Sequence, residues 1–251
     1  MCIRDRDYHE LDHHEIDIYL IQGAPCLLKG MSEHASENAE KFLKDLGVKV
    51  ITNMRVNGYD GEFVHMADGS TIRTQKVIWA AGIIGNKLEG FSDDAFAYGG
   101  RFAVNRFNQI NGHENIYAIG DIAYMEEEAF PQGHPQVAQV AIQQGKLLAK
   151  NLKQNSEGGK MEEFIYKDLG SMATIGRNKA VCDLPRYKFK GFFAWVTWLI
   201  VHLFSLIGVK NKLFVFINWS WNYMTYDQSL RLVIKPKILR EKDSQELMEE
   251  K

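Results

Sequence analysis

A glycine followed by an aspartate ends one apolar run of the sequence. Asn115-Ile116-Tyr117-Ala118-Ile119 is rich in β-branched and aromatic residues, which predicts a buried strand, and it stops at Gly120-Asp121. Glycine at a strand end lets a ligand approach the backbone, and a carboxylate there can accept hydrogen bonds from sugar or ribityl hydroxyls. An aspartate in a surface turn has the same local pattern, so the pair alone indicates only a candidate binding position.

Two glutamines follow at helical spacing. Residues 136–152 have the apolar periodicity of a helix, and Gln139 and Gln143, four residues apart, lie on one face near its N-terminus. The positive end of the helix dipole can favour an electron-rich or anionic group there. Glutamine pairs on helices are more often solvated, so this signal also gains weight only in combination.

A third candidate position is the run of small residues Ala80-Ala81-Gly82. It ends a predicted strand over 76–80, and Rossmann-type domains place their ligands outside the carboxyl ends of such strands. Taken alone, a plain transition from strand to loop explains this run better.

The elements around these positions indicate an α/β fold. A strand at 16–21, a helix that begins after Ser32 and ends near Leu46 before Gly47, and a strand at 48–52 form a predicted βαβ unit. Short alternating runs between 54 and 73, punctuated by Asp-Gly pairs, predict an antiparallel meander.

A second unit begins near Arg101 and includes the Gly-Asp strand and the glutamine helix. Residues 156–160 are typical of a linker, and a β-rich patch is predicted at 164–166 and 171–175. We therefore divide the chain into four predicted parts: 7–100, 101–155, 156–240 and a charged tail at 241–251.

Composition narrows the class of protein. The chain has 251 residues, 45% of them hydrophobic and 25% charged, which is ordinary for a folded protein. The net charge of −2 gives no reason to expect nucleic-acid binding. Its three scattered cysteines form neither a CxxC pair nor a zinc-site pattern, and they fit a reducing compartment.

Charge and tryptophan are concentrated near the C-terminus. Between Arg186 and Lys237 the sequence has eight basic residues, one acid and four of the five tryptophans. The uncharged run 192–209 and the aromatic run 213–226 predict two helices lying in a membrane interface rather than crossing it, with lysines at the margins that attract anionic lipid. A hydrophobic hairpin packed on its own domain or at a dimer seam is the alternative. The residues predicted to contact the membrane are Trp195, Trp198, Trp219, Trp221, Lys210 and Lys212.

Three stretches together resemble one family. Val77-Ile78-Trp79-Ala80-Ala81-Gly82, Ile116 to Asp121, and Ala138-Gln139-Val140-Ala141-Ile142-Gln143 have the order and separation seen in type II NADH dehydrogenases, and the Trp-, Tyr- and Lys-rich tail is similar as well. The resemblance runs from about residue 7 to residue 236. It implies a partial flavoprotein with two dinucleotide-binding domains of Rossmann type and a C-terminal amphipathic helical segment that binds the membrane.

The resemblance also assigns roles. Gly120 and Asp121 would hold the ribityl chain of FAD, Gln139 would lie beside the isoalloxazine ring, and Gln139 and Gln143 would line the quinone site. Ala80 and Gly82 would lie near the nicotinamide of NADH. The flavin carries the redox chemistry, so no protein nucleophile and no metal is expected. The implied protein is a peripheral homodimer on the cytoplasmic face of the inner (plasma) membrane.

Two departures from the family pattern stand out. Relatives have an acid that bonds the adenosine ribose after the strand at 16–21, and Gln22 stands there, which favours tolerance of NADPH. The sequence also contains no GxGxxG motif, so the chain alone is expected neither to bind FAD tightly nor to turn over.

Three other classes remain open. A disulfide oxidoreductase would have a soluble β-rich C-terminal domain in place of the basic aromatic tail. A sulfide:quinone reductase needs cysteines near the flavin, where Cys26 and Cys182 do not lie. A non-catalytic module for membrane attachment or dimerisation is the third alternative.

Overall fold

The structure is a computed structural model that describes residues 16–225. The chain divides into two compact units, one of which is Tyr19–Trp195. The described part of the other comprises residues 16–18 and 196–225, which include most of the C-terminal helices. The predicted charged tail at 241–251 lies outside the described residues.

The N-terminal strand, helix and strand form as expected. β1 (Ile18–Ile21) and β2 (Val48–Ile51) are neighbours in a two-stranded sheet, and α2 (Glu33–Asp45) connects them. Ser32 caps the helix, with its hydroxyl oxygen accepting a hydrogen bond from Ala35 N at 3.3 Å. Beyond β1, the Gln22 N–H donates to Ile51 O at 2.8 Å.

The meander is also confirmed. β3 (Val56–Tyr59), β4 (Phe63–Met66) and β5 (Thr71–Arg73) pair antiparallel in that order. At the β3–β4 turn the Asp60 carboxylate accepts hydrogen bonds from the backbone N–H groups of Glu62 and Phe63. The two Asp-Gly pairs therefore predicted the positions of these turns correctly.

The predicted strand at 76–80 does not form. These residues have no strand neighbour in the described part of the chain, and Ile78 is 93% exposed while Trp79 is 65% exposed. A strand is stable only when a neighbour accepts and donates its backbone hydrogen bonds, so an apolar run without one stays extended and irregular.

The central part of the first unit is a small mixed sheet. β7 (Arg101–Ala103) pairs antiparallel with β6 (Phe96–Ala97) and parallel with β8 (Ala123–Tyr124). The largest cluster of buried residues lies around it: Ala95, Phe102, Val104, Ile110, Ala118, Ala123, Met125 and Phe164.

The prediction of a sheet strand at 115–121 is also wrong. Tyr117 forms one isolated bridge with Gln109, and Gly120–Ile122 is a 3-10 turn. The Ala118 side chain is buried in the core, but Ile116 and Ile119 are more than a third exposed. The apolar residues correctly predicted that this segment contacts the core. Its backbone hydrogen bonds, however, join it to loop residues rather than to a strand.

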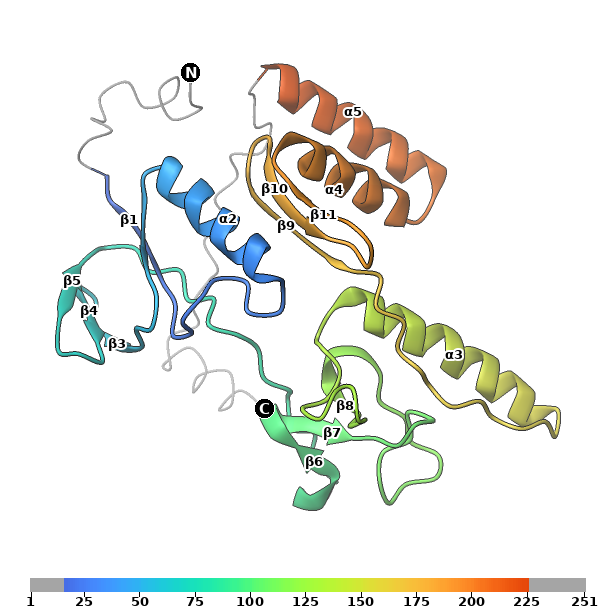
Figure 1. Cartoon of the computed structure of the whole chain (residues 1–251). Helices are drawn as coiled ribbons and strands as arrows, with labels where there is room; N and C mark the ends of the chain where they lie inside the picture. Colours follow the sequence, from blue (N-terminus) through green and yellow to red (C-terminus); the bar gives the residue numbers. More distant parts are fainter. Residues whose placement is uncertain (1–15, 226–251) are drawn as a thin grey trace, which may run out of the picture. The chain divides into compact units, whose positions relative to one another are not determined.

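α3 (Ala138–Ser156) is the long helix predicted from the glutamine-bearing sequence. After it the chain turns and runs back beside the helix, as Figure 1 shows, before entering β9. We call residues 161–170 the return segment. It is extended and includes the predicted strand at 164–166, but the described residues provide no strand neighbour for it.

An antiparallel sheet follows, formed by β9 (Ser171–Gly176), β10 (Lys179–Asp183) and β11 (Lys188–Lys190) in the order β11-β10-β9. Sequence analysis predicted β9 and missed β10 and β11. The side chains of Ala180 and Cys182 form a second buried cluster with Ala194, from the first turn of α4.

The last described elements are α4 (Phe192–Ser205) and α5 (Val209–Thr225), close to the two predicted helices. Trp198 of α4 lies 6.1 Å from Trp219 of α5, centroid to centroid, and stacks on His202 at 3.9 Å. Among the described residues no helix is both long and apolar enough to cross a bilayer.

Candidate functional site

The Gly-Asp turn packs directly on the glutamine helix. The Gly120 N–H donates to Oε1 of Gln144 at 2.7 Å, and both residues are buried. Gly120 has a φ of +71°, and a Cβ at this position would lie 3.0 Å from the Cβ of Ala141. Glycine is required here because the backbone adopts a left-handed conformation against a helix surface.

Asp121 presents its carboxylate to solvent. Its carbonyl oxygen accepts a hydrogen bond from Nε2 of Gln136 at 3.0 Å, while the side chain is exposed. Within residues 16–225 the carboxylate has no hydrogen bond and no ion pair. The turn is therefore held rigidly from both sides while its acidic group stays free to accept donors from a ligand.

Gln139 and Gln143 both pair with the return segment. Nε2 of Gln143 donates to Lys167 O at 2.9 Å, and Lys167 N–H donates back to Oε1 at 3.0 Å. Gln139 makes the equivalent pair, donating to Gly170 O and accepting from Leu169 N–H, each at 3.1 Å. The two amides therefore satisfy backbone groups of the return segment, as a neighbouring strand would. Each amide keeps one N–H and one oxygen lone pair for a further partner.

Gln143 also borders a shallow groove. The groove has a volume of about 390 Å³ and lies between α3 and the return segment. Its walls combine apolar surface from Leu147 and Phe164 with the cationic side chains of Lys146 and Lys150. The lining is therefore mixed, since Glu163 and Ile165 complete it beside Gln143.

Sequence analysis missed a buried arginine beside the Gly-Asp turn. Arg101 is 6% exposed, and its Nη2 donates to the carbonyl oxygens of Ala123 and His134. Burial lowers the pKa of this guanidinium, while the nearby Tyr124 and Asp121 oppose that change. A single arginine in a short strand belongs to no sequence pattern that would predict its burial beside the Gly-Asp turn.

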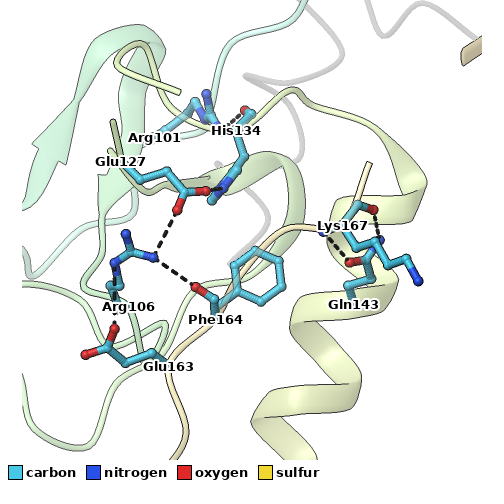
Figure 2. A network of polar contacts seen from close by, with 8 residues as sticks. All are labelled: Arg101, Arg106, Glu127, His134, Gln143, Glu163, Phe164 and Lys167. Atoms are coloured by element: carbon cyan, nitrogen blue, oxygen red, sulfur yellow. Dashed lines mark hydrogen bonds and ion pairs between the residues drawn. The ribbon is translucent and has the colours of Figure 1, made fainter. Parts of the chain in front are cut away.

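A second feature that sequence analysis missed is a charged cluster formed by Arg106, Glu127 and His134. Glu127 accepts hydrogen bonds from Nη1 of Arg106 at 2.9 Å and from Nε2 of His134. Figure 2 shows Arg106 also reaching the Phe164 carbonyl oxygen, at 3.2 Å. His134 and Glu127 belong to no local sequence pattern, so sequence analysis did not pair them.

The chain matches two known family models in order. Residues 8–145 match the pyridine nucleotide-disulphide oxidoreductase model, and residues 169–225 match the NDH2 C-terminal domain. The chain belongs to the pyridine nucleotide-disulphide oxidoreductase family and resembles the type II NADH dehydrogenases.

Individual proteins agree with this assignment. The chain is 32% identical to the type II NADH:quinone oxidoreductase Ndh of Mycobacterium tuberculosis, over 87% of its own length and 48% of that protein's. It is 30% identical to the internal alternative NAD(P)H-ubiquinone oxidoreductase A1, mitochondrial, of Arabidopsis thaliana, over 88% of its length and 46% of that protein's. The chain thus spans about half the length of the curated relatives it matches.

Among solved structures, the fold is similar to NDH2 from Plasmodium falciparum in complex with NADH. The TM-score is 0.76 at 20% identity, and the alignment covers 86% of this chain and 60% of that one. This likeness confirms the Rossmann-type flavoprotein fold expected for a type II NADH dehydrogenase.

The two candidate nicotinamide residues lie in an exposed segment that forms no pocket around them in the described part of the chain. Ala80 and Gly82 belong to the exposed irregular segment after β5, and a Cβ on Gly82 would meet no atom within 4 Å. Gln22 lies directly after β1, at the carboxyl end of that strand, with its side chain half-buried.

The candidate membrane residues of the NDH2 C-terminal domain divide into two groups. Trp195 packs on the Ala180–Cys182 cluster, and Trp198 and Trp219 pack near one another, so all three are half-buried. Trp221 is 61% exposed. Lys212 lies over the Phe204 ring and Lys210 over the Phe214 ring. The most exposed apolar side chains of this region were not among the predicted residues: Phe193, Phe204, Ile207, Val209 and Met224.

Proposed function

We propose that this chain forms the quinone-side and membrane-side part of an FAD-dependent NADH:quinone oxidoreductase. The proposal is supported by the ordered match to both family models and by relatives named for that activity. FAD, when bound, supplies the chemistry by taking a hydride from NADH and passing the electrons on to a quinone. The role of the protein is to bind, orient and shield the reactants.

The observation that carries the proposal is the packing of the Gly120-Asp121 turn on α3. Because Gln144 and Gln136 hold the backbone of the turn from two sides, the position of Asp121 is fixed, and its carboxylate keeps an unused set of acceptor lone pairs. Hydroxyls of a ribityl chain are suitable donors for it. We assign Gly120 and Asp121 to FAD binding, with Gln139 on the same helix beside the flavin ring.

We assign the quinone to the face of α3 that carries Gln139 and Gln143. Each glutamine retains one N–H after pairing with the return segment, and such a donor can hydrogen-bond a quinone carbonyl. The groove beside Gln143 is suited to the ring or to the start of an isoprenoid chain.

We assign Ala80 and Gly82 to the approach of the nicotinamide and Gln22 to the adenosine ribose. A neutral amide at Gln22 does not repel a 2′-phosphate, so NADPH competes better with NADH than it would against a carboxylate. Gln22→Glu in the complete protein is expected to raise the KM for NADPH about tenfold and to leave the KM for NADH within about twofold. Equal KM values for NADPH in the two proteins would refute this assignment.

We further propose that α4 and α5 hold the protein against the cytoplasmic face of a membrane as a peripheral homodimer. The support is the exposed apolar surface of both helices together with Lys210 and Lys212, whose charges attract anionic lipid. Phe204, Ile207 and Trp221 are the side chains we expect to enter the headgroup region.

Flavin content tests the redox part of the proposal. In the complete protein, Asp121→Ala is expected to lower the amount of FAD that copurifies and the rate of NADH oxidation by a soluble quinone by at least about tenfold. Asp45→Ala, which removes an exposed acid from α2 instead, is the matched control. If FAD content were the same in wild type and Asp121→Ala, the assignment of Asp121 would be wrong.

Vesicle flotation tests the membrane part with the chain itself. Anionic vesicles are expected to carry the chain upward more strongly than neutral vesicles, and Lys210→Gln with Lys212→Gln should weaken that binding about thirtyfold, at about 1 kcal/mol for each lysine. Lys41→Gln with Lys44→Gln on α2 removes the same charge elsewhere and should change nothing. Absence of flotation on both vesicle types would favour a soluble oligomer.

A further inference from the structure

The return segment (residues 161–170) has an unusual set of hydrogen-bond partners. It is extended, yet among the described residues no strand lies beside it, so its backbone groups need other partners. Side chains supply them at four places along its length: Asn151 to Glu162, Arg106 to Phe164, Gln143 to Lys167, and Gln139 to Leu169 and Gly170. Three of these partners come from α3.

The attachment at Phe164 differs from the others because it does not come from α3. Phe164 N–H donates to Arg106 O at 2.8 Å, and Nη1 of Arg106 donates back to Phe164 O at 3.2 Å. The same Nη1 donates to Glu127 at 2.9 Å. The Phe164 ring is 2% exposed and belongs to the central core. One arginine therefore joins the return segment to an acid from the loop after β8.

Glu127 connects this arginine to a buried histidine. Its second oxygen pairs with Nε2 of His134, whose side chain is 1% exposed, while Glu127 itself is 10% exposed. The rings of Phe130, Phe164 and Tyr166 surround the imidazole with centroids 5.0 to 5.6 Å away. Nδ1 of His134 is buried without a hydrogen-bond partner among the described residues. The ring is thus fixed by one carboxylate and by contact with the return segment.

This cluster controls how far the return segment can move from α3. Phe164 and Tyr166, two residues apart on an extended chain, point the same way and rest on His134. Lys167 and Leu169, just beyond them, give their N–H groups to Gln143 and Gln139. Figure 2 shows the charged cluster and the Gln143–Lys167 pair on the two sides of this segment.

We propose that Glu127 is a positioning residue for the two glutamines. By holding Arg106 and His134, it fixes the return segment, and the backbone of that segment then fixes which way the Gln139 and Gln143 amides face. A primary amide can otherwise turn by half a rotation and exchange its donor for its acceptor. The role in quinone binding rests on the function proposed above, whereas the effect on the return segment does not.

The charged surroundings supply a matched control. Arg106 has a second acidic neighbour, Glu163, with Nε to Oε2 3.9 Å apart and the Glu163 side chain 60% exposed. Glu127→Gln and Glu163→Gln remove the same charge from partners of the same arginine. Glu127 is the less exposed of the two acids, at 10% against 60%, so loss of its charge is screened less by water than loss of the Glu163 charge.

Residue-specific amide hydrogen exchange tests the proposal on the whole chain. In Glu127→Gln the N–H groups of Lys167 and Leu169 are expected to exchange at least about tenfold faster than in wild type, because local opening becomes easier. In Glu163→Gln they should stay within about twofold. The N–H of Val181 in β10 reports global unfolding and should not change in either variant. Equal exchange at Lys167 in the two variants, or an equal rise at Val181, would overturn the proposal.

Arg106→Lys gives an independent version of the same test. It keeps the positive charge beside Glu127, but a lysine lacks the planar set of donors needed to reach both Glu127 and the Phe164 carbonyl oxygen. Faster exchange at Lys167 and Leu169 with unchanged Val181 is again expected. Unchanged exchange at Lys167 here would contradict the proposal even if Glu127→Gln proved too unstable to study.

Kinetics of the complete protein separate this inference from the proposed function. Glu127→Gln is expected to raise the KM for quinone about fivefold and to change the rate of flavin reduction by NADH less than that, because both glutamines belong to the proposed quinone site whereas only Gln139 is assigned beside the flavin ring. Faster exchange at Lys167 with an unchanged KM for quinone would confirm the positioning of the return segment and remove Gln139 and Gln143 from the quinone site.

Discussion

Gln144 accepts a hydrogen bond from the Gly120 backbone N–H at 2.7 Å, and both groups are buried. The first turns of α3 and the Gly-Asp turn are therefore one unit, although 24 residues separate the two partners. Any group that binds at Asp121 depends on this contact for its position.

Replacing Gln144 tests the strength of that contact. Gln144→Leu leaves the Gly120 N–H buried without an acceptor, which is expected to lower the free energy of unfolding by about 1–3 kcal/mol. Urea denaturation followed by circular dichroism measures the change. Gln136→Leu, which removes a more exposed donor to Asp121 O, should cost less than about 0.5 kcal/mol. Equal costs for the two variants would show that burial of the Gly120 N–H is unimportant.

Gly120→Ala tests the backbone conformation of the same turn. At a φ of +71°, with the new Cβ 3.0 Å from Ala141 Cβ, the substitution is expected to cost at least about 1–2 kcal/mol. The double variant Gly120→Ala with Ala141→Gly removes the contact but not the backbone strain. It should show a favourable coupling of about 0.5 kcal/mol or more in a double-mutant cycle. Strict additivity would mean that the Ala141 contact does not contribute.

The pair Ser32–Asp183 joins α2 to β10. Ser32 donates from its hydroxyl to Oδ1 of Asp183 at 2.9 Å and from its N–H to Oδ2 at 2.6 Å. Ser32→Ala is expected to cost about 1 kcal/mol, because it removes both the cap of α2 and this contact. In a cycle with Asp183→Asn the two effects should be less than additive by about 0.5 kcal/mol or more. Ser156→Ala, at an exposed helix end, is the control and should be neutral.

Tyr166 gives the return segment an alkaline pH dependence. Burial, followed by the nearby Asp168, raises the pKa of Tyr166 to about 12 from the ordinary 10.0. The folded state thus holds its proton more tightly than the unfolded state, so its contribution to stability is complete below pH 10 and declines as the pH rises towards 12. Tyr166→Phe should remove this part of the alkaline loss of stability, measured by urea denaturation at a series of pH values. Tyr98→Phe, which removes an exposed tyrosine, should leave the alkaline loss as it is in wild type.

Local sequence signals were sufficient for much of the fold. Helix period, the Ser32 cap and Gly47 predicted α2, the Asp-Gly pairs predicted the β3–β4–β5 meander, and apolar runs predicted α3, α4 and α5. These elements satisfy their hydrogen bonds within themselves or with the next strand in sequence, so a short stretch of residues contains the needed information.

The failures all concern strands, because a strand depends on hydrogen-bond partners that its own composition does not report. Residues 76–80 and 115–119 have strand-like composition but lack a strand neighbour in the described chain, and composition cannot report whether a neighbour is present. β10 and β11 were missed for the converse reason, since these short segments have weak patterns of their own and are stabilised by pairing, β10 with β9 and β11 with β10.

The candidate site shows the same division. The sequence identified Gly120, Asp121, Gln139 and Gln143 by residue type and spacing, and it determined the chemistry that these groups can offer. Only the tertiary structure decided which of their atoms remain available, because it alone brings the return segment to the two glutamines and Gln144 to Gly120. Glu127, His134 and Arg106 had no local signal at all. Their importance comes from burial in a shared core, a property that a linear pattern does not contain.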